Sequence, residues 1–171
     1  MNLPSPSPQS RPTQTPPCSR RERWLLFVAE GFGLGRTRFA PGTFGSLPGV
    51  LLMGGLQWLH AGQLPCLAVW LLCFLFGIPL CRRAAELRGK PDPGSVVWDE
   101  ITAFALLAAV AKPGWQGLLA AFVLFRIFDI AKPWPVNRLE RLHGGFGIMA
   151  DDQAAALWAA LLLALTQRSL V

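Results

Sequence analysis

The chain has 171 residues, a mean hydropathy of +0.38 and charged side chains at only 15% of its positions. Soluble domains are about one-quarter charged, so this composition is atypical of a protein surrounded by water. The net charge of +6 comes from basic residues that flank apolar runs, which favours anionic lipid head groups over nucleic acid as partners. We predict an integral membrane protein that binds no nucleic acid. The alternative is a very apolar helical domain that docks on a membrane or associates with its own copies.

The beginning of the chain is rich in proline, serine, threonine and glutamine. Such a segment has little apolar surface to offset the entropy lost on ordering. We therefore predict a disordered arm over residues 1–22, followed by a single helical domain over residues 23–171.

Two short segments precede the long apolar runs. Residues 23–30 are predicted to form a short helix at the membrane interface. Their apolar part is too short for a signal peptide, because Glu30 interrupts it. Residues 31–46 contain so many glycines and prolines that we expect no regular structure there.

Five uncharged or nearly uncharged runs of helical length follow. They show no alternation of apolar and polar residues, which is the pattern of half-buried strands. The predicted fold class is therefore all-α, a membrane-embedded bundle of five main helices. The predicted helices span residues 47–59, 64–81, 101–111, 115–131 and 153–166.

The basic residues indicate how these helices are oriented. Arginines and lysines gather before the first run, between the second and third, and between the fourth and fifth. The other two turns contain only Lys112. Basic loops stay on the cytoplasmic side of a membrane, so two helical hairpins bring four motif-bearing segments to that face. These segments are Pro41–Ser46, Asp99–Glu100, Asp129–Lys132 and His143–Asp152.

Two pairs of adjacent acids begin predicted helices at this face, Asp99–Glu100 and Asp151–Asp152. Acids at a helix start also cap free N–H groups and interact with the positive end of the helix dipole, so each pair alone has a purely structural explanation. Two such pairs at one face repel each other unless a cation or basic groups intervene. Carboxylate oxygens are ligands of Mg²⁺, so the acids are candidate metal ligands.

Asp129 lies near the C-terminal end of its predicted helix, where the helix dipole disfavours an anion. Arg126 and Lys132 are three residues away on either side, on the same helical face. A local salt bridge is one explanation. The other is a metal-binding carboxylate beside two cations that bind phosphate oxygens.

Two glycine-containing segments carry further candidates. Residues 143–152 are predicted to form a glycine-rich loop before a helix, a possible cradle for an anion. His143 is a candidate general acid, or simply a polar residue at the interface. In the segment Pro41–Ser46, Thr43 and Ser46 are candidate phosphate-binding hydroxyls, or alternatively a helix cap.

At these residues the chain resembles the phosphatidylglycerophosphatase A family. The resemblance rests on four motifs in the family's order and with similar spacing, and it covers residues 31–165. It implies a Mg²⁺-dependent lipid phosphatase of the bacterial inner membrane, which converts phosphatidylglycerophosphate to phosphatidylglycerol and phosphate. The four motifs are PGTFGS (41–46), GSVVWDE (94–100), FRIFDIAKPWP (125–135) and HGGFGIMADD (143–152).

The resemblance also implies roles for individual residues. The metal ligands would be Asp99, Glu100, Asp129, Asp151 and Asp152. Arg126 and Lys132 would contact the phosphate. The residues predicted to act in catalysis are Asp99, Asp129, Asp152, Arg126, Lys132 and His143.

Two points stay open at this stage. The attacking group is either a water molecule or an aspartate that forms a phosphoenzyme. The alternative functions are a head-group transferase and a non-enzymatic membrane scaffold or cation-transport subunit. The D-G-x-x-A-R pattern of CDP-alcohol transferases is absent from the sequence, and the acids cluster at one face rather than along a transmembrane path.

Overall fold

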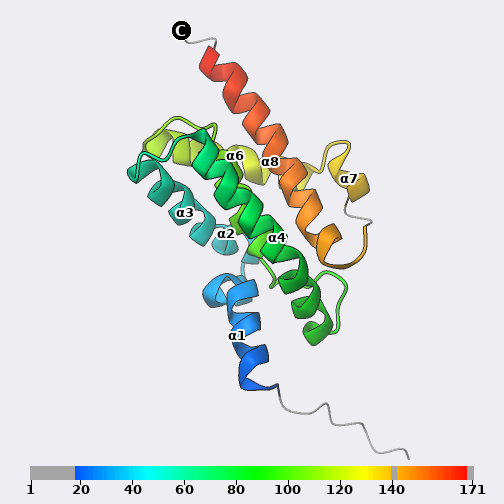
Figure 1. Cartoon of the computed structure of the whole chain (residues 1–171). Helices are drawn as coiled ribbons and strands as arrows, with labels where there is room; N and C mark the ends of the chain where they lie inside the picture. Colours follow the sequence, from blue (N-terminus) through cyan, green and yellow to red (C-terminus); the bar gives the residue numbers. More distant parts are fainter. Residues whose placement is uncertain (1–17, 140–141, 169–171) are drawn as a thin grey trace, which may run out of the picture.

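A computed structural model describes residues 18–139 and 142–168, and every regular element in these ranges is helical (Figure 1). The predicted all-α class is confirmed, and the five predicted main helices correspond to α3, α4, α5, α6 and α8. The elements are α1 (Arg20–Ala29), η1 (Gly31–Arg36), α2 (Pro41–Gly45), α3 (Leu47–Trp58), α4 (Gln63–Arg88), α5 (Trp98–Ala108), α6 (Trp115–Ala131), α7 (Val136–Leu139) and α8 (Gly144–Arg168).

Helix α5 is the centre of the bundle. Every residue from Asp99 to Ala108 is buried, and the helix packs against α3, α4 and α8. The fully buried Phe104 contacts Phe125 of α6 edge-to-face, with ring centroids 5.2 Å apart. Figure 1 shows α4 and α8 side by side and antiparallel. The hydrophobic core therefore surrounds a short helix whose first turn carries two acids.

Two helices are long and apolar enough to cross a membrane, α4 and residues Gly144–Thr166 of α8. Only 22% of the apolar window of α4 is buried inside the protein, and Leu64, Leu72 and Leu75 are exposed. Such a surface is favourable in lipid and costly in water. Together with the family findings below, it supports membrane association.

Helices α4 and α8 are both longer than predicted. Helix α4 continues past Pro79 to Arg88, so the basic segment after residue 81 is helical. A proline inside a helix removes one backbone hydrogen bond, a loss that neighbouring helices can compensate. Helix α8 begins at Gly144, so the predicted glycine-rich loop over residues 143–152 is wrong.

The glycines at the start of α8 permit close packing against α4. A Cβ atom on Gly145 would lie 1.8 Å from the carbonyl oxygen of Ile78. Only a residue without a side chain fits there, because the obstructing atom belongs to the backbone.

The N-terminal part also differs from the prediction. Residues 31–46 contain η1 and α2 instead of being irregular throughout. Helix α1 begins at Arg20 with a capping box between Ser19 and Glu22, so the last residues assigned to the arm are helical. The rest of the predicted arm, residues 1–17, lies outside the described residues.

The turns after α3 and after α5 lie at one end of the bundle. The side-chain amide of Gln57 donates to the carbonyl of Lys112 at 3.3 Å, and its oxygen accepts from the N–H of Gly114 at 3.4 Å. The segments before α3, before α5 and after α6 therefore meet at the opposite end, as the hairpin arrangement predicts.

Two glycines of α3 allow a matched test of this packing. A Cβ on Gly49 would lie 2.6 Å from the ring of Phe104 and 3.0 Å from Cα of Ile101, whereas a Cβ on Gly55 would have open space. We expect Gly49→Ala to reduce stability by about 1–3 kcal/mol through overpacking. Gly55→Ala should be neutral or stabilise by up to about 1 kcal/mol, because alanine favours helix.

Thermal denaturation of both variants in the same detergent measures this difference. Equal stability of the two variants would contradict the close approach of α3 and α5.

Candidate active site

Arg126 of α6 joins two carboxylates. Its Nη1 atom lies 2.8 Å from Oδ2 of Asp129 and 3.3 Å from Oε1 of Glu100. The salt bridge along α6 was one of the two sequence interpretations, and the structure adds a link to α5. Ser46 donates a hydrogen bond to the other oxygen of Glu100. Because Ser46 is fully buried, its hydroxyl positions Glu100 and does not reach the surface.

The start of α2 lies directly against this ion pair. A Cβ on Gly42 would lie 2.6 Å from Oε1 of Glu100 and 2.8 Å from Nη1 of Arg126. The Oγ atom of Ser46 also lies 2.7 Å from the carbonyl oxygen of Gly42. Thr43, the next residue along α2, is half-buried. The PGTFGS motif therefore forms a compact turn over the arginine.

Asp99 of α5 and Asp152 of α8 belong to two helices that pack directly against each other. The exposed fractions of the two acids are 9% and 6%, and neither carboxylate forms an ion pair in the described part of the chain. Gln153 links α8 to α5, because its side-chain amide donates to the main-chain carbonyl of Asp99 at 3.1 Å. The Gln153 oxygen in turn accepts from Trp70 of α4 at 2.8 Å.

Burial strongly affects the acids of α5. It raises the pKa of Asp99 well above its ordinary value, and the charges of Glu100 and Asp151 raise it further. Burial also raises the pKa of Glu100, to about 7, against the lowering effect of its contacts with Ser46 and Arg126. Strongly perturbed pKa values in buried acids are typical of functional sites.

Lys132 connects the end of α6 to α8. Its Nζ atom lies 3.4 Å from Oδ2 of Asp151. The sequence placed Lys132 near Asp129 on one helical face. The left-handed backbone of Lys132 ends α6, and its side chain contacts Asp151 of α8. Asp151 and Asp152 lie well inside α8 and not at its start, so neither acid is an N-terminal cap.

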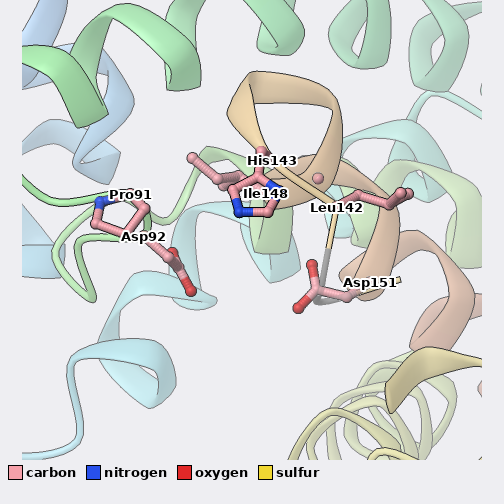
Figure 2. Close-up of a pocket in the computed structure, with 7 residues that line it drawn as sticks. Pro91, Asp92, Leu142, His143, Ile148 and Asp151 are labelled. Carbon is pink, nitrogen blue, oxygen red and sulfur yellow. The ribbon is translucent and has the colours of Figure 1, made fainter. Parts of the chain in front are cut away.

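A cavity of about 460 Å³ opens beside these acids. Figure 2 shows the carboxylates of Asp92 and Asp151 on either side of it, with the imidazole of His143 between them in the view. His143 is exposed and can meet a ligand in this space. The remaining lining residues are Pro91, Leu142, Gly147 and Ile148.

Only some of the acids in this region have a carboxylate left to bind Mg²⁺. Among the described residues, no three His, Cys, Asp or Glu side chains form a compact metal-binding group. Glu100 and Asp129 already form ion pairs with Arg126, and Asp151 forms one with Lys132. Asp99 and Asp152 remain, and Mg²⁺ is commonly held by one or two carboxylates together with water and substrate phosphate. The donor set therefore fits this ion.

The structure brings the five predicted acids, Arg126 and Lys132 to one end of the bundle, with His143 across the adjoining cavity. Sequence reasoning missed Gly42, Asp92 and Gln153. Asp92 had a usable signal, since it is an acid in a turn directly before the motif that contains Asp99. Gly42 and Gln153 gave none, because their roles depend on contacts between distant helices.

Known proteins are similar to this chain over most of its length. The sequence profile of the family described as Phosphatidylglycerophosphatase A matches residues 27–167. A phosphatidylglycerophosphatase A of Haemophilus influenzae is 45% identical, over 81% of this chain and 86% of its own. The Escherichia coli protein of that name is 43% identical, over 82% and 81%.

A Bacteroides thetaiotaomicron protein described as "Putative phosphatidylinositol-3-phosphatase" is 36% identical, over 83% of this chain and 92% of its own. No solved structure matches the chain.

The fold and the comparisons together define an enzyme that hydrolyses a phosphate monoester and associates with membranes. The chain belongs to the phosphatidylglycerophosphatase A family. This membership excludes the non-enzymatic scaffold and the head-group transferase considered from the sequence.

The contact between Gly42 and the arginine can be tested directly. We expect Gly42→Ala to reduce phosphate release roughly tenfold or more, because the added methyl displaces the Arg126 guanidinium from Glu100. Phosphate release by the purified variant in detergent measures the effect, with thermal stability measured in parallel. Gly55→Ala is the control, and equal activity of the two variants would contradict a role for this contact.

Proposed function

We propose that this protein is a Mg²⁺-dependent phosphatase that converts phosphatidylglycerophosphate to phosphatidylglycerol and inorganic phosphate. The observation that carries the proposal is the convergence of Asp99 and Asp152 beside Arg126 and Lys132, at the end of the bundle that bears the basic loops. This combination of carboxylates and cations suits a dianionic phosphate ester. The names of the relatives supply the substrate.

Asp99 and Asp152 would hold the magnesium ion, with Asp151, Glu100 and Asp129 around them. When bound, the ion would neutralise charge on the phosphoryl group and offset the repulsion between buried acids. Gln153 supports the pair by fixing the backbone of Asp99 relative to α8.

Arg126 and Lys132 would bind the oxygens of the phosphate. Arg126 is held by carboxylates on two helices, so its guanidinium is oriented before substrate arrives. Its Nε–H group is buried and has no hydrogen-bond partner in the described structure. A planar guanidinium presents several donors, so it can contact phosphate and still retain a carboxylate.

His143 would act on the leaving group. Cleavage of the phosphorus–oxygen bond leaves an alkoxide on the glycerol, which needs a proton. His143 lines the cavity together with Asp151 and is exposed to it, so it can donate that proton.

The metal assignment predicts that Asp99→Asn abolishes turnover. We expect a loss of at least about 100-fold, because an amide oxygen is a weaker ligand for Mg²⁺ than a carboxylate. Chelation should likewise abolish activity of the wild-type protein, and added Mg²⁺ should restore it. Inorganic phosphate released from phosphatidylglycerophosphate measures both effects.

Glu86→Gln is the matched control, since Glu86 is an exposed acid that, among the described residues, pairs with Arg82 and Arg83 on its own helix α4. Full activity of Asp99→Asn, or of the chelated wild type, would refute the assignment.

We also propose that the active end faces the cytoplasm of a bacterial inner membrane. The basic residues around the site support this orientation. In a cysteine-free background, Gly94→Cys should react with a membrane-impermeant thiol reagent only after cells are opened. Ala61→Cys, in the turn before α4, should react in intact cells. The reverse pattern of labelling would contradict the proposed orientation.

A further inference from the structure

The cavity lined by Asp92 and Asp151 is called the acidic cavity below. A second cavity, of about 630 Å³, lies near it and is lined by basic side chains; it is called the basic cavity. It lies between α1, η1, the end of α4 and the loop before α5. None of its lining residues is an acid. The cations that line it are Arg23, Arg36, Arg38, Arg88 and Lys90.

A buried carboxylate holds two of these arginines in place. Glu30 has an exposed fraction of 0%, and both Arg36 and Arg88 form ion pairs with it. The Nε of Arg88 lies 2.6 Å from Oε1 of Glu30, and Ser95 donates to the same oxygen at 3.2 Å. One carboxylate between two guanidinium groups leaves a net positive charge. The two arginines are therefore held in place without being neutralised.

The other cations are available to a ligand. Arg38 and Lys90 are exposed, and neither has an ion pair in residues 18–139 and 142–168. Arg38 lies just after η1, and Lys90 lies in the loop after α4. Two separate parts of the chain therefore place positive charge at the same cavity. Convergent cations around a concave surface are typical of a phosphate-binding site.

The basic cavity adjoins the candidate active site. Pro91 and Asp92 line the acidic cavity, while Lys90 and the residues from Pro93 to Ser95 line the basic one. One loop therefore separates the two spaces. On the other side, Pro41 lines the basic cavity and its neighbour Gly42 packs against Arg126.

We infer that the basic cavity binds the internal phosphodiester of the lipid substrate, while the terminal phosphate monoester is held at the acidic site. This inference rests on the proposed function and extends it to selectivity. Phosphatidylglycerophosphate carries two phosphates joined by a glycerol unit. Two adjacent sites, one suited to a metal-bound monoester and one built of cations alone, match these two groups. Phosphatidic acid carries only the monoester, so it would leave the basic cavity empty.

Binding without turnover tests this inference. The detergent-solubilised full chain is kept in chelator, and its dissociation constants for phosphatidylglycerophosphate and phosphatidic acid are measured in mixed micelles. We expect the wild type to prefer phosphatidylglycerophosphate. The double variant Arg38→Ala/Lys90→Ala should bind that lipid about tenfold or more weakly, with binding of phosphatidic acid unchanged.

Arg21→Ala is the matched control, because it removes an exposed cation of α1 that lies outside the cavity. It should leave both affinities unchanged. A double variant that keeps the wild-type preference, or that loses affinity for both lipids equally, would overturn the inference.

A separate anionic lipid is the other possible source of a phosphodiester. Addition of phosphatidylserine distinguishes the two sources. If it saturates the basic cavity and strengthens binding of both substrates in the wild type but not in the double variant, the cavity serves a neighbouring lipid and the inference is wrong. These binding measurements need no catalysis. The proposed function is tested separately, by phosphate release, so either proposal can fail without the other.

Discussion

The shared ion pair of Arg126 with Glu100 and Asp129 is the interaction on which the site depends. A carboxylate buried among apolar helices loses its hydration, and a cation with good hydrogen-bond geometry compensates for part of that loss. Because the two carboxylates belong to different helices, the same guanidinium also sets the relation between α5 and α6. Ser46 and Gly42 complete the arrangement from α2. Its consequence is a fixed cation next to the uncompensated acids Asp99 and Asp152.

The central position of α5 explains how such a small bundle holds the acids of this helix in fixed positions. The helix has 11 residues, and its first turn lies at the end of the bundle where the basic loops meet. Helices α3, α4 and α8 all pack on it, so each acid is positioned by several elements. Exposed leucines on α4 give the bundle an apolar outer surface, which is favourable in lipid.

Much of this fold follows from local sequence signals, whereas much of the site does not. The bounds of α3 and α6 were predictable because glycines and prolines mark their ends. The start of α8 was missed because consecutive glycines usually indicate a loop, and only their packing against α4 makes them helical. Arg126 and Asp129 were predictable partners, since three residues separate them on one helix. Their link to Glu100, and the bond from Gln153 to Asp99, depend on tertiary packing that spacing along the chain does not encode.

The contact between Gly145 and the carbonyl of Ile78 has an evolutionary consequence. Asp151 and Asp152 lie about two turns further along the same rigid helix, so the tilt of α8 at its first turn determines where both acids are placed. Any larger residue at position 145 would push the beginning of α8 away from α4 and move the acids without touching them. Purifying selection should therefore act on this glycine as strongly as on the chemical groups themselves, although it never meets the substrate.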